Sequence, residues 1–185
     1  MCGVIKMIKS FSCSNFRNVN VKNLKFSKIN ILIGPNNSGK TNFIKALSFC
    51  ADMLSCSGKL VGDSAFQTLI SKSGMGDIYN KYAEDTAQGI SMRWNLELDE
   101  EKKVSYQFNF HTGNEMKDFF ITRESLEDTC QRRNKKKPFN YFTCNERPGE
   151  GYISREVNIG ESNSRISFEI HKNEPIFSQF ATIRL

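Results

Sequence analysis

Apolar and polar residues alternate in two neighbouring stretches in the middle of the chain. In the first stretch the apolar positions are Ile90, Met92, Trp94, Leu96 and Leu98. In the second they are Val104, Tyr106, Phe108 and Phe110. Successive side chains of a strand point to opposite faces, so each stretch predicts a strand with one apolar face. The charged sequence DEEKK separates them, and the whole segment therefore predicts an antiparallel hairpin.

Other stretches predict further strands. The segment VIKMIKSFSCSNFRNV has short apolar runs and predicts a first strand. Lys22 to Ile33 predicts a second strand, which ends in the apolar run Ile29–Ile33 before a glycine. Such a run is typical of a buried central strand. The segment DFFITRESLE predicts one more strand, and residues 151–172 predict another hairpin.

The period of the pattern changes after this glycine. Phe43, Leu47, Cys50 and Leu54 fall on one helical stripe, with Ile44 and Ala51 beside it. The segment therefore predicts a helix that begins at Lys40 and ends near Ser55 to Gly58. Residues 65–85 predict a short helix and a loop, and the segment after Pro175 predicts the start of a helix.

Composition narrows the class of protein. A chain of 185 residues can form one domain with its own core. It contains no apolar run long enough to cross a membrane and no signal-peptide pattern, so we expect a cytoplasmic protein without a membrane partner. The six cysteines form no C-x-x-C pair and the two histidines are far apart, which predicts reduced thiols and no metal cluster.

The positive charge is concentrated at the start of the chain. The formal net charge is +6, and the first sixty residues contain nine lysines or arginines and a single acidic residue, Asp52. This distribution suits an anionic partner such as a nucleotide or a nucleic acid. Solubility combined with a phosphate site would explain it equally well.

Gly34 to Thr41 reads GPNNSGKT and fits the pattern G-x-x-x-x-G-K-[ST]. Main-chain N–H groups of such a loop wrap a polyphosphate, and the following helix directs its N-terminus at it. The lysine, Lys40, reaches the β- and γ-phosphates, and the hydroxyl of Thr41 coordinates Mg²⁺. An apolar strand before the motif and an amphipathic helix after it are the context that this reading requires. The sequence therefore predicts that ATP and Mg²⁺ are the ligands.

The segment NFRNVNVKNLKFSKINILIGPNNSGKTNFIKAL resembles the N-terminus of ABC-type ATPases of the RecF/SMC/OLD group. The pair Asn36–Asn37 and the residue Asn42 distinguish it from small GTPases and kinases. As far as about Leu126 the chain is also similar to AAA-family ATPases of bacterial anti-phage systems. The resemblance implies an α/β fold, namely a P-loop NTPase head lobe with a mixed central sheet and an antiparallel β subdomain.

The resemblance also implies site residues. The nucleotide-binding residues would be Gly34, Asn36, Asn37, Ser38, Gly39, Lys40, Thr41 and Asn42, with Thr41 as the Mg²⁺ ligand. Arg17 of the NFR segment would lie near the nucleotide, although it could equally be a surface arginine at a strand end. Gln179 is the candidate for the glutamine that senses Mg²⁺ and the γ-phosphate, with Gln131 as a weaker one. The candidate catalytic residues are therefore Lys40 and Gln179.

Two elements of such an ATPase have no good match in the sequence. The pair Asp99–Glu100 follows an alternating stretch, whereas the strand before a catalytic Asp–Glu pair is buried and continuously apolar. The segment Leu54 to Lys59 resembles the S-x-G signature but ends a helix. We therefore expect residues 1–185 to be an N-terminal lobe, with a Walker A core at about 1–58 and an antiparallel subdomain with an insertion at about 88–172. The C-terminal lobe would follow Leu185 or belong to a second polypeptide.

The expected function is MgATP binding, with hydrolysis when a C-terminal lobe or a partner subunit completes the site. The resemblance implies a homodimer or higher oligomer of heads that controls a DNA-linked or anti-phage effector, such as a nuclease or a toxin-like protein. A non-hydrolysing nucleotide-dependent scaffold or regulatory subunit is an alternative, and another P-loop enzyme such as a kinase is a second.

A basic segment between the two predicted hairpins is a further candidate. It contains Arg132, Arg133, Lys135, Lys136 and Lys137, and the aromatic residues Phe139, Tyr141 and Phe142 follow it. Such residues could contact nucleic acid through phosphates and bases. A solvated loop beside a strand with core aromatics is the simpler interpretation.

Overall fold

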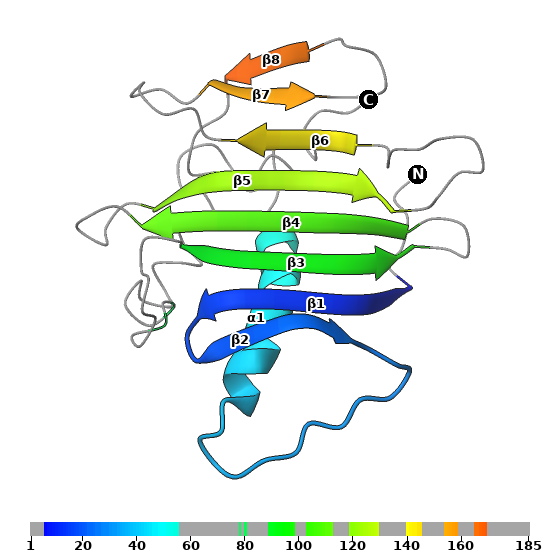
Figure 1. Cartoon of the computed structure of the whole chain (residues 1–185), viewed down its shortest axis with the longest axis vertical. Helices are drawn as coiled ribbons and strands as arrows, with labels where there is room; N and C mark the ends of the chain where they lie inside the picture. The colour runs from blue at the N-terminus through cyan, green and yellow to red at the C-terminus, as the bar shows by residue number, and fades with distance from the viewer. Residues whose placement is uncertain are drawn as a thin grey trace.

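The computed structural model describes residues 6–55, 78, 80, 89–98, 103–112, 119–129, 140–145, 154–158 and 165–169. Six strands form an antiparallel sheet in the order β2-β1-β3-β4-β5-β6 (Figure 1). Their bounds are Met7–Phe16 for β1, Val19–Lys25 for β2, Ile90–Glu97 for β3, Lys103–Thr112 for β4, Phe119–Asp128 for β5 and Asn140–Asn145 for β6. The helix α1 spans Lys40–Ser55, and β7 (Ser154–Asn158) and β8 (Arg165–Glu169) form a separate two-stranded sheet.

The predicted hairpins are confirmed. β3 and β4 pair antiparallel from Ile90 opposite Phe110 to Glu97 opposite Lys103. β7 and β8 form the second predicted hairpin, and β1 and β5 lie where the sequence places strands. The strand β6 begins at Asn140, where the basic segment was expected to end, and it pairs with β5. Its pairing with β5 was not predicted, because β6 is short and directly follows the basic segment, so its alternation of apolar and polar residues is not distinct.

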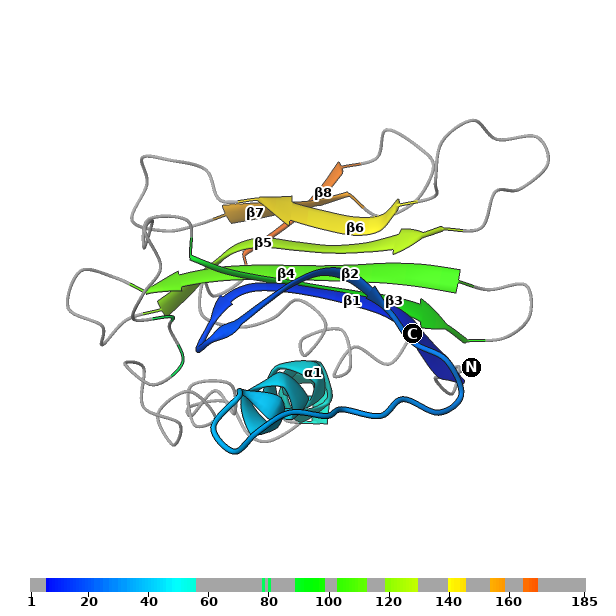
Figure 2. The same cartoon turned by 60° about the horizontal axis from the view of Figure 1, so that its bottom comes forward.

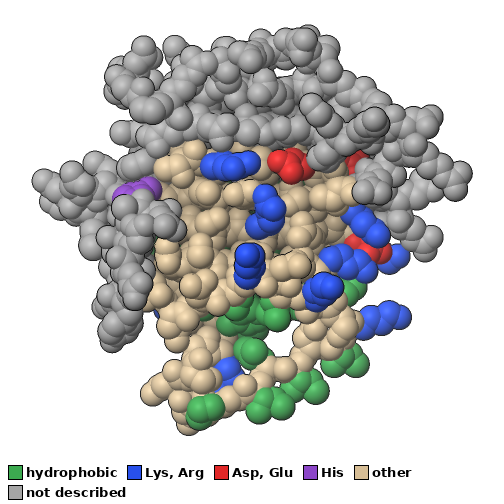
Figure 3. All heavy atoms as spheres, in the orientation of Figure 1, with side chains coloured by type: hydrophobic (Ala, Val, Ile, Leu, Met, Phe, Trp, Pro, Cys, Tyr) green, Lys and Arg blue, Asp and Glu red, His purple; other side chains and the backbone are tan. Residues whose placement is uncertain are grey.

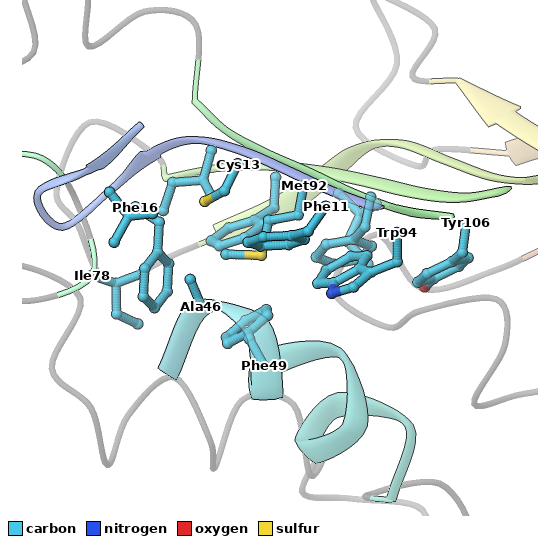
Figure 4. Close-up of a cluster of buried hydrophobic side chains, with 14 of the residues drawn as sticks. Phe11, Cys13, Phe16, Ala46, Phe49, Ile78, Met92, Trp94 and Tyr106 are labelled. Carbon is cyan, nitrogen blue, oxygen red and sulfur yellow. The ribbon is translucent and has the colours of Figure 1, made fainter. Parts of the chain in front are cut away.

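One face of the sheet is apolar and packs against α1, as Figure 2 shows. The apolar positions of β3 and β4 are buried on this face, as the alternation predicts. The ring centroids of Phe11 and Trp94 lie 5.4 Å apart (Figure 4). The ring of Phe49 stacks on that of Phe110, with 5.7 Å between the centroids. Burial of each such side chain contributes about 1.5–3 kcal/mol. This cluster is the core that fixes α1 on the sheet.

The buried side of α1 is rotated from the predicted stripe. Ala46 is fully buried and Phe49 is 5% exposed, whereas Phe43 and Leu47 are partly buried and Ile44 is 54% exposed. The small side chain of Ala46 lets the helix approach the sheet, and the Phe49 ring then reaches Phe110. The side chains of Cys50 and Leu54 lie outside the described part of the structure.

The prediction of a strand from Lys22 to Ile33 is wrong for its second half. β2 ends at Lys25, and the segment between β2 and α1 then leaves the sheet (Figure 1). The side-chain Nδ2 of Asn30 donates to the carbonyl of Ser27 at 2.9 Å, and its Oδ1 accepts from the backbone N–H of Ser27 at 3.0 Å. These local bonds turn the chain away from β1, as asparagine side chains commonly do.

Residues 29–33 are exposed in this structure, contrary to the expected buried central strand. The exposed fractions are 80% for Ile29, 79% for Ile31 and 87% for Ile33. No described residue forms a hydrogen bond with the backbone of residues 31–33. All strand pairs among the described residues are antiparallel, so the expected mixed sheet is not present in this part of the chain.

No helix in the described part of the chain is both long enough and apolar enough to cross a membrane.

Candidate nucleotide-binding site

The loop from Gly34 to Gly39 has the backbone conformations that a phosphate-binding loop needs. Asn37 has a φ of 65° and Gly39 a φ of 93°. Alternation of positive and negative φ directs successive N–H groups into one concavity, where they can bind an anion. Asparagine tolerates the left-handed region, but a φ of 93° is a glycine conformation. This requirement explains why a glycine stands at position 39.

The N-terminus of α1 follows the loop directly. The helix begins at Lys40 and has 16 residues, and its first turn contains no acidic side chain. The N–H of Phe43 donates to the carbonyl of Gly39 at 2.8 Å, so the helical bonds begin at the loop itself. A helix N-terminus carries partial positive charge and unsatisfied N–H groups, which favour an anion. Thr41 is exposed at this end of the helix, as a Mg²⁺ ligand has to be.

The ammonium group of Lys40 folds back over the loop. Its Nζ donates to the carbonyl of Gly34 at 2.6 Å, to that of Pro35 at 2.5 Å and to the hydroxyl of Ser38 at 3.3 Å. The positive charge therefore lies beside the N–H groups of the loop. A lysine side chain has three rotatable N–H donors, so the same ammonium can turn to an anion held in the loop.

Arg17 lies beside this loop, in the two-residue turn between β1 and β2. Its Nη1 donates to the side-chain oxygen of Asn42 at 3.2 Å, and its guanidinium lies 5.9 Å from the Phe16 ring centroid. Its φ of 53° lies in the left-handed region, which is unfavourable for a residue with a Cβ. Such turn positions are more often occupied by glycine or asparagine. Its Nε is buried without a hydrogen-bond partner. The structure thus places Arg17 next to Asn42 at the start of α1, at the cost of local strain.

Asn18 is a residue of the site that the sequence interpretation missed. The Asn42 amide donates to the Asn18 side-chain oxygen at 2.9 Å. A Cβ atom at Gly39 would come within 2.7 Å of the Asn18 amide nitrogen. Asn18 therefore packs on the backbone of the loop and, through Asn42, joins the β1–β2 turn to α1. The only signal in the sequence was its position beside Arg17.

The predicted residues from Gly34 to Asn42 and Arg17 thus lie together in space. Gln179, Gln131 and the basic residues Arg132, Arg133, Lys135, Lys136 and Lys137 lie outside the described residues. The pair Asp99–Glu100 does too, but the strand before it, β3, alternates between buried and partly exposed positions. This alternation agrees with the reading of β3 as a hairpin strand.

Cys13 is a buried free thiol in the core. Burial raises the pKa of this thiol to about 12, although a backbone hydrogen bond from Phe16 acts in the opposite direction. A thiol with so high a pKa is unreactive at neutral pH. The Cys13 side chain belongs to the hydrophobic core of the described residues. No group of three or more metal-ligating side chains occurs among the described residues.

No curated protein and no solved structure shows significant similarity to this chain. Residues 29–181 do match a known family, described as "AAA domain, putative AbiEii toxin, Type IV TA system". The matched segment begins at the run before the phosphate loop and includes all the strands from β3 to β8. The chain therefore belongs to this family of AAA-domain proteins.

Proposed function

We propose that this chain is the nucleotide-binding lobe of an ABC-type ATPase head of the RecF/SMC/OLD group, and that it binds MgATP in the cytoplasm. The observation that supports this most directly is the position of the Lys40 ammonium over a loop with positive φ at Asn37 and Gly39, directly before the N-terminus of α1. Each of these features favours a polyphosphate, and they converge on one point.

In this proposal the loop, the first residues of α1 and Arg17 contact different parts of MgATP. The main-chain N–H groups of the loop, which Pro35 lacks, bind phosphate oxygens, Lys40 turns from the carbonyls of Gly34 and Pro35 to the β- and γ-phosphates, and Thr41 holds Mg²⁺. Mg²⁺, when bound, neutralises charge on these two phosphates. Arg17 is held beside the loop by Asn42 and lies within reach of the same nucleotide.

We further propose that hydrolysis requires a second lobe, from a downstream segment or a partner subunit. The loop and the first turn of α1 contain no acidic residue that could activate a water molecule. Residues 29–33 expose apolar side chains on both sides of an extended segment, as a strand of a buried sheet would before its neighbours are added (Figure 3). A lobe that supplies strands beside this segment would complete a mixed sheet and bring the missing carboxylate to the loop.

Two heads joined by ATP could then control an effector, such as a nuclease or a toxin-like protein in an anti-phage system. This part of the proposal rests on the resemblance of the sequence.

The second candidate function is a non-hydrolysing, nucleotide-dependent scaffold. The absence of an acidic residue from the loop and the first turn of α1 favours it equally. A kinase has less support, because the sheet that packs on α1 is antiparallel, whereas kinases of the P-loop class alternate parallel strands and helices.

Phosphate release from ATP by the full-length protein distinguishes the candidates. Mg²⁺-dependent turnover that is lost in Lys40→Ala supports the ATPase. ATP binding without turnover supports the scaffold, and transfer of phosphate to an added acceptor supports a kinase. The exposed residue Lys45 on the same helix is the matched control, since Lys45→Ala removes the same charge without touching the loop.

A further inference from the structure

The face of the sheet that points away from α1 is polar across the central parts of β1, β3 and β4. Figure 3 views this face, because α1 lies behind the sheet in the same orientation (Figure 1). Between Ser10 and Ser14, Ser91 and Asn95, and Ser105 and Asn109, every second residue is Ser, Asn, Gln or Arg. No β-branched residue faces this side within these stretches, although such residues are the usual choice in strands. The polar side chains of these stretches differ in exposure, since Ser10 and Ser105 are buried whereas Arg93 is exposed.

Arg93 lies near the centre of this face and is not neutralised. Its Nη2 donates to the side-chain oxygen of Gln107, and the Gln107 amide donates in turn to Asn109 at 3.3 Å. The hydroxyl of Ser91 donates to the same Asn109 oxygen at 2.9 Å. A cross-strand arginine commonly faces an acidic residue, and here a neutral amide takes that place. The guanidinium is therefore held in position with its full positive charge.

Further positive charges lie on the same face. Arg123 on β5 is opposite Asn109, and Lys22 and Lys25 lie on β2. All three are exposed, and none of them forms an ion pair with another described residue. Figure 3 shows separate basic side chains across a polar surface with few acidic ones. Two acidic side chains share this face: Glu97 at the margin, which is paired with Lys9, and Glu127 on β5, which lies opposite Ser105.

We propose that this face binds the phosphate backbone of a nucleic acid. Separated cations that form no ion pair with a described residue, on a surface of hydroxyl and amide groups, match a chain of phosphates, which accept hydrogen bonds from arginine, serine, asparagine and glutamine side chains. The polar stretches of β1, β3 and β4 present no phenylalanine, tyrosine or tryptophan on this side for stacking on bases. Recognition is therefore independent of base sequence and sensitive to salt. This proposal does not depend on ATP binding, since the helix that follows the phosphate loop packs against the opposite face of the sheet (Figure 2).

The test is fluorescence anisotropy of labelled, mixed-sequence DNA with the full-length protein over a series of KCl concentrations. Single strands and duplexes are measured separately, without nucleotide. The variant Arg93→Gln/Arg123→Gln is compared with Lys28→Gln/Lys45→Gln, which removes the same charge at exposed positions outside this face. Loss of two phosphate contacts lowers the slope of log affinity against log salt by about 1.4 for a single strand and about 1.8 for a duplex.

We expect the arginine variant to bind DNA at least about tenfold more weakly at low salt, with the reduced slope, and the lysine control to bind as the wild type does. If the arginine variant does not fold, the variant Lys22→Gln/Lys25→Gln on the edge strand β2 replaces it, and we expect the same loss of DNA affinity and the same reduced salt slope. Equal loss in the control, no loss in either face variant, or no binding at low salt would overturn the proposal. Tighter binding of polyglutamate than of DNA would also overturn it, because the partner would then be an acidic protein.

Discussion

Gly39, Asn18 and Asn42 form the contact on which the geometry of the phosphate loop depends. Gly39 supplies a φ of 93°, Asn18 packs on its Cα, and Asn42 joins Asn18 and Arg17 to the start of α1. Two separate constraints therefore favour glycine at position 39: the positive φ of its backbone and the close contact with Asn18. Substitutions can separate the effect of the backbone conformation from that of the Asn18 contact.

The variant Gly39→Ala should destabilise the fold by about 1–3 kcal/mol, because alanine is strained at this φ and its Cβ meets Asn18. Gly39→Ala/Asn18→Ala should recover part of this loss, since it removes the close neighbour but not the backbone strain. Urea unfolding followed by the fluorescence of Trp94, the single tryptophan, measures both. Asn18→Ala alone is the control. Full recovery in the double variant would show that the backbone conformation is not the constraint.

The segment between β2 and α1 differs from every other described apolar segment. In β3 and β4 the apolar side chains face α1 and are buried, whereas Ile29, Ile31 and Ile33 face solvent. The same residue type thus occurs in two environments that the sequence does not distinguish. An apolar side chain stabilises the fold only when it is buried. An isoleucine of β3 should therefore contribute more to the free energy of unfolding than an isoleucine of residues 29–33.

The matched pair Ile33→Ser and Ile90→Ser tests this difference. Ile33 is 87% exposed and Ile90 is fully buried. We expect Ile33→Ser to change the free energy of unfolding by less than about 0.5 kcal/mol, as most surface substitutions do. Ile90→Ser should destabilise the chain by about 3 kcal/mol or more, through the lost contacts and the buried hydroxyl. Equal effects in urea unfolding would mean that residues 29–33 are already packed against the chain.

The chain as a whole is a sheet with three different surfaces. One face forms the core with α1, the other face is polar and basic, and the loop before α1 is the candidate phosphate site (Figures 2 and 3). With this separation the two proposed ligands, a nucleotide and a nucleic acid, would bind at different places. Residues 29–33 remain exposed, as the proposed second lobe would require.

Much of this arrangement could be predicted from the sequence, because local patterns determine it. Alternation at Ile90–Leu98 and Val104–Phe110 gave the hairpin and its buried face, and the motif Gly34–Thr41 gave the loop. The contacts of Asn18 and the rotation of α1 depend on neighbours far away in the sequence, so no local pattern encodes them. The exposure of Ile29–Ile33 could not be predicted either, because an apolar run indicates that burial is favourable but not which partner provides it.

Isothermal titration of this chain with ATP in the presence of Mg²⁺ tests the central claim most directly. The account predicts saturable binding that weakens at least about tenfold in Lys40→Ala, since a hydrogen bond to a charged group contributes about 1.5–3 kcal/mol. Lys45→Ala, which removes an exposed lysine of the same helix, should bind as the wild type does. Equal binding by Lys40→Ala and the wild type, or no binding by any of the three proteins, would contradict the assignment of Gly34–Thr41 as a nucleotide site.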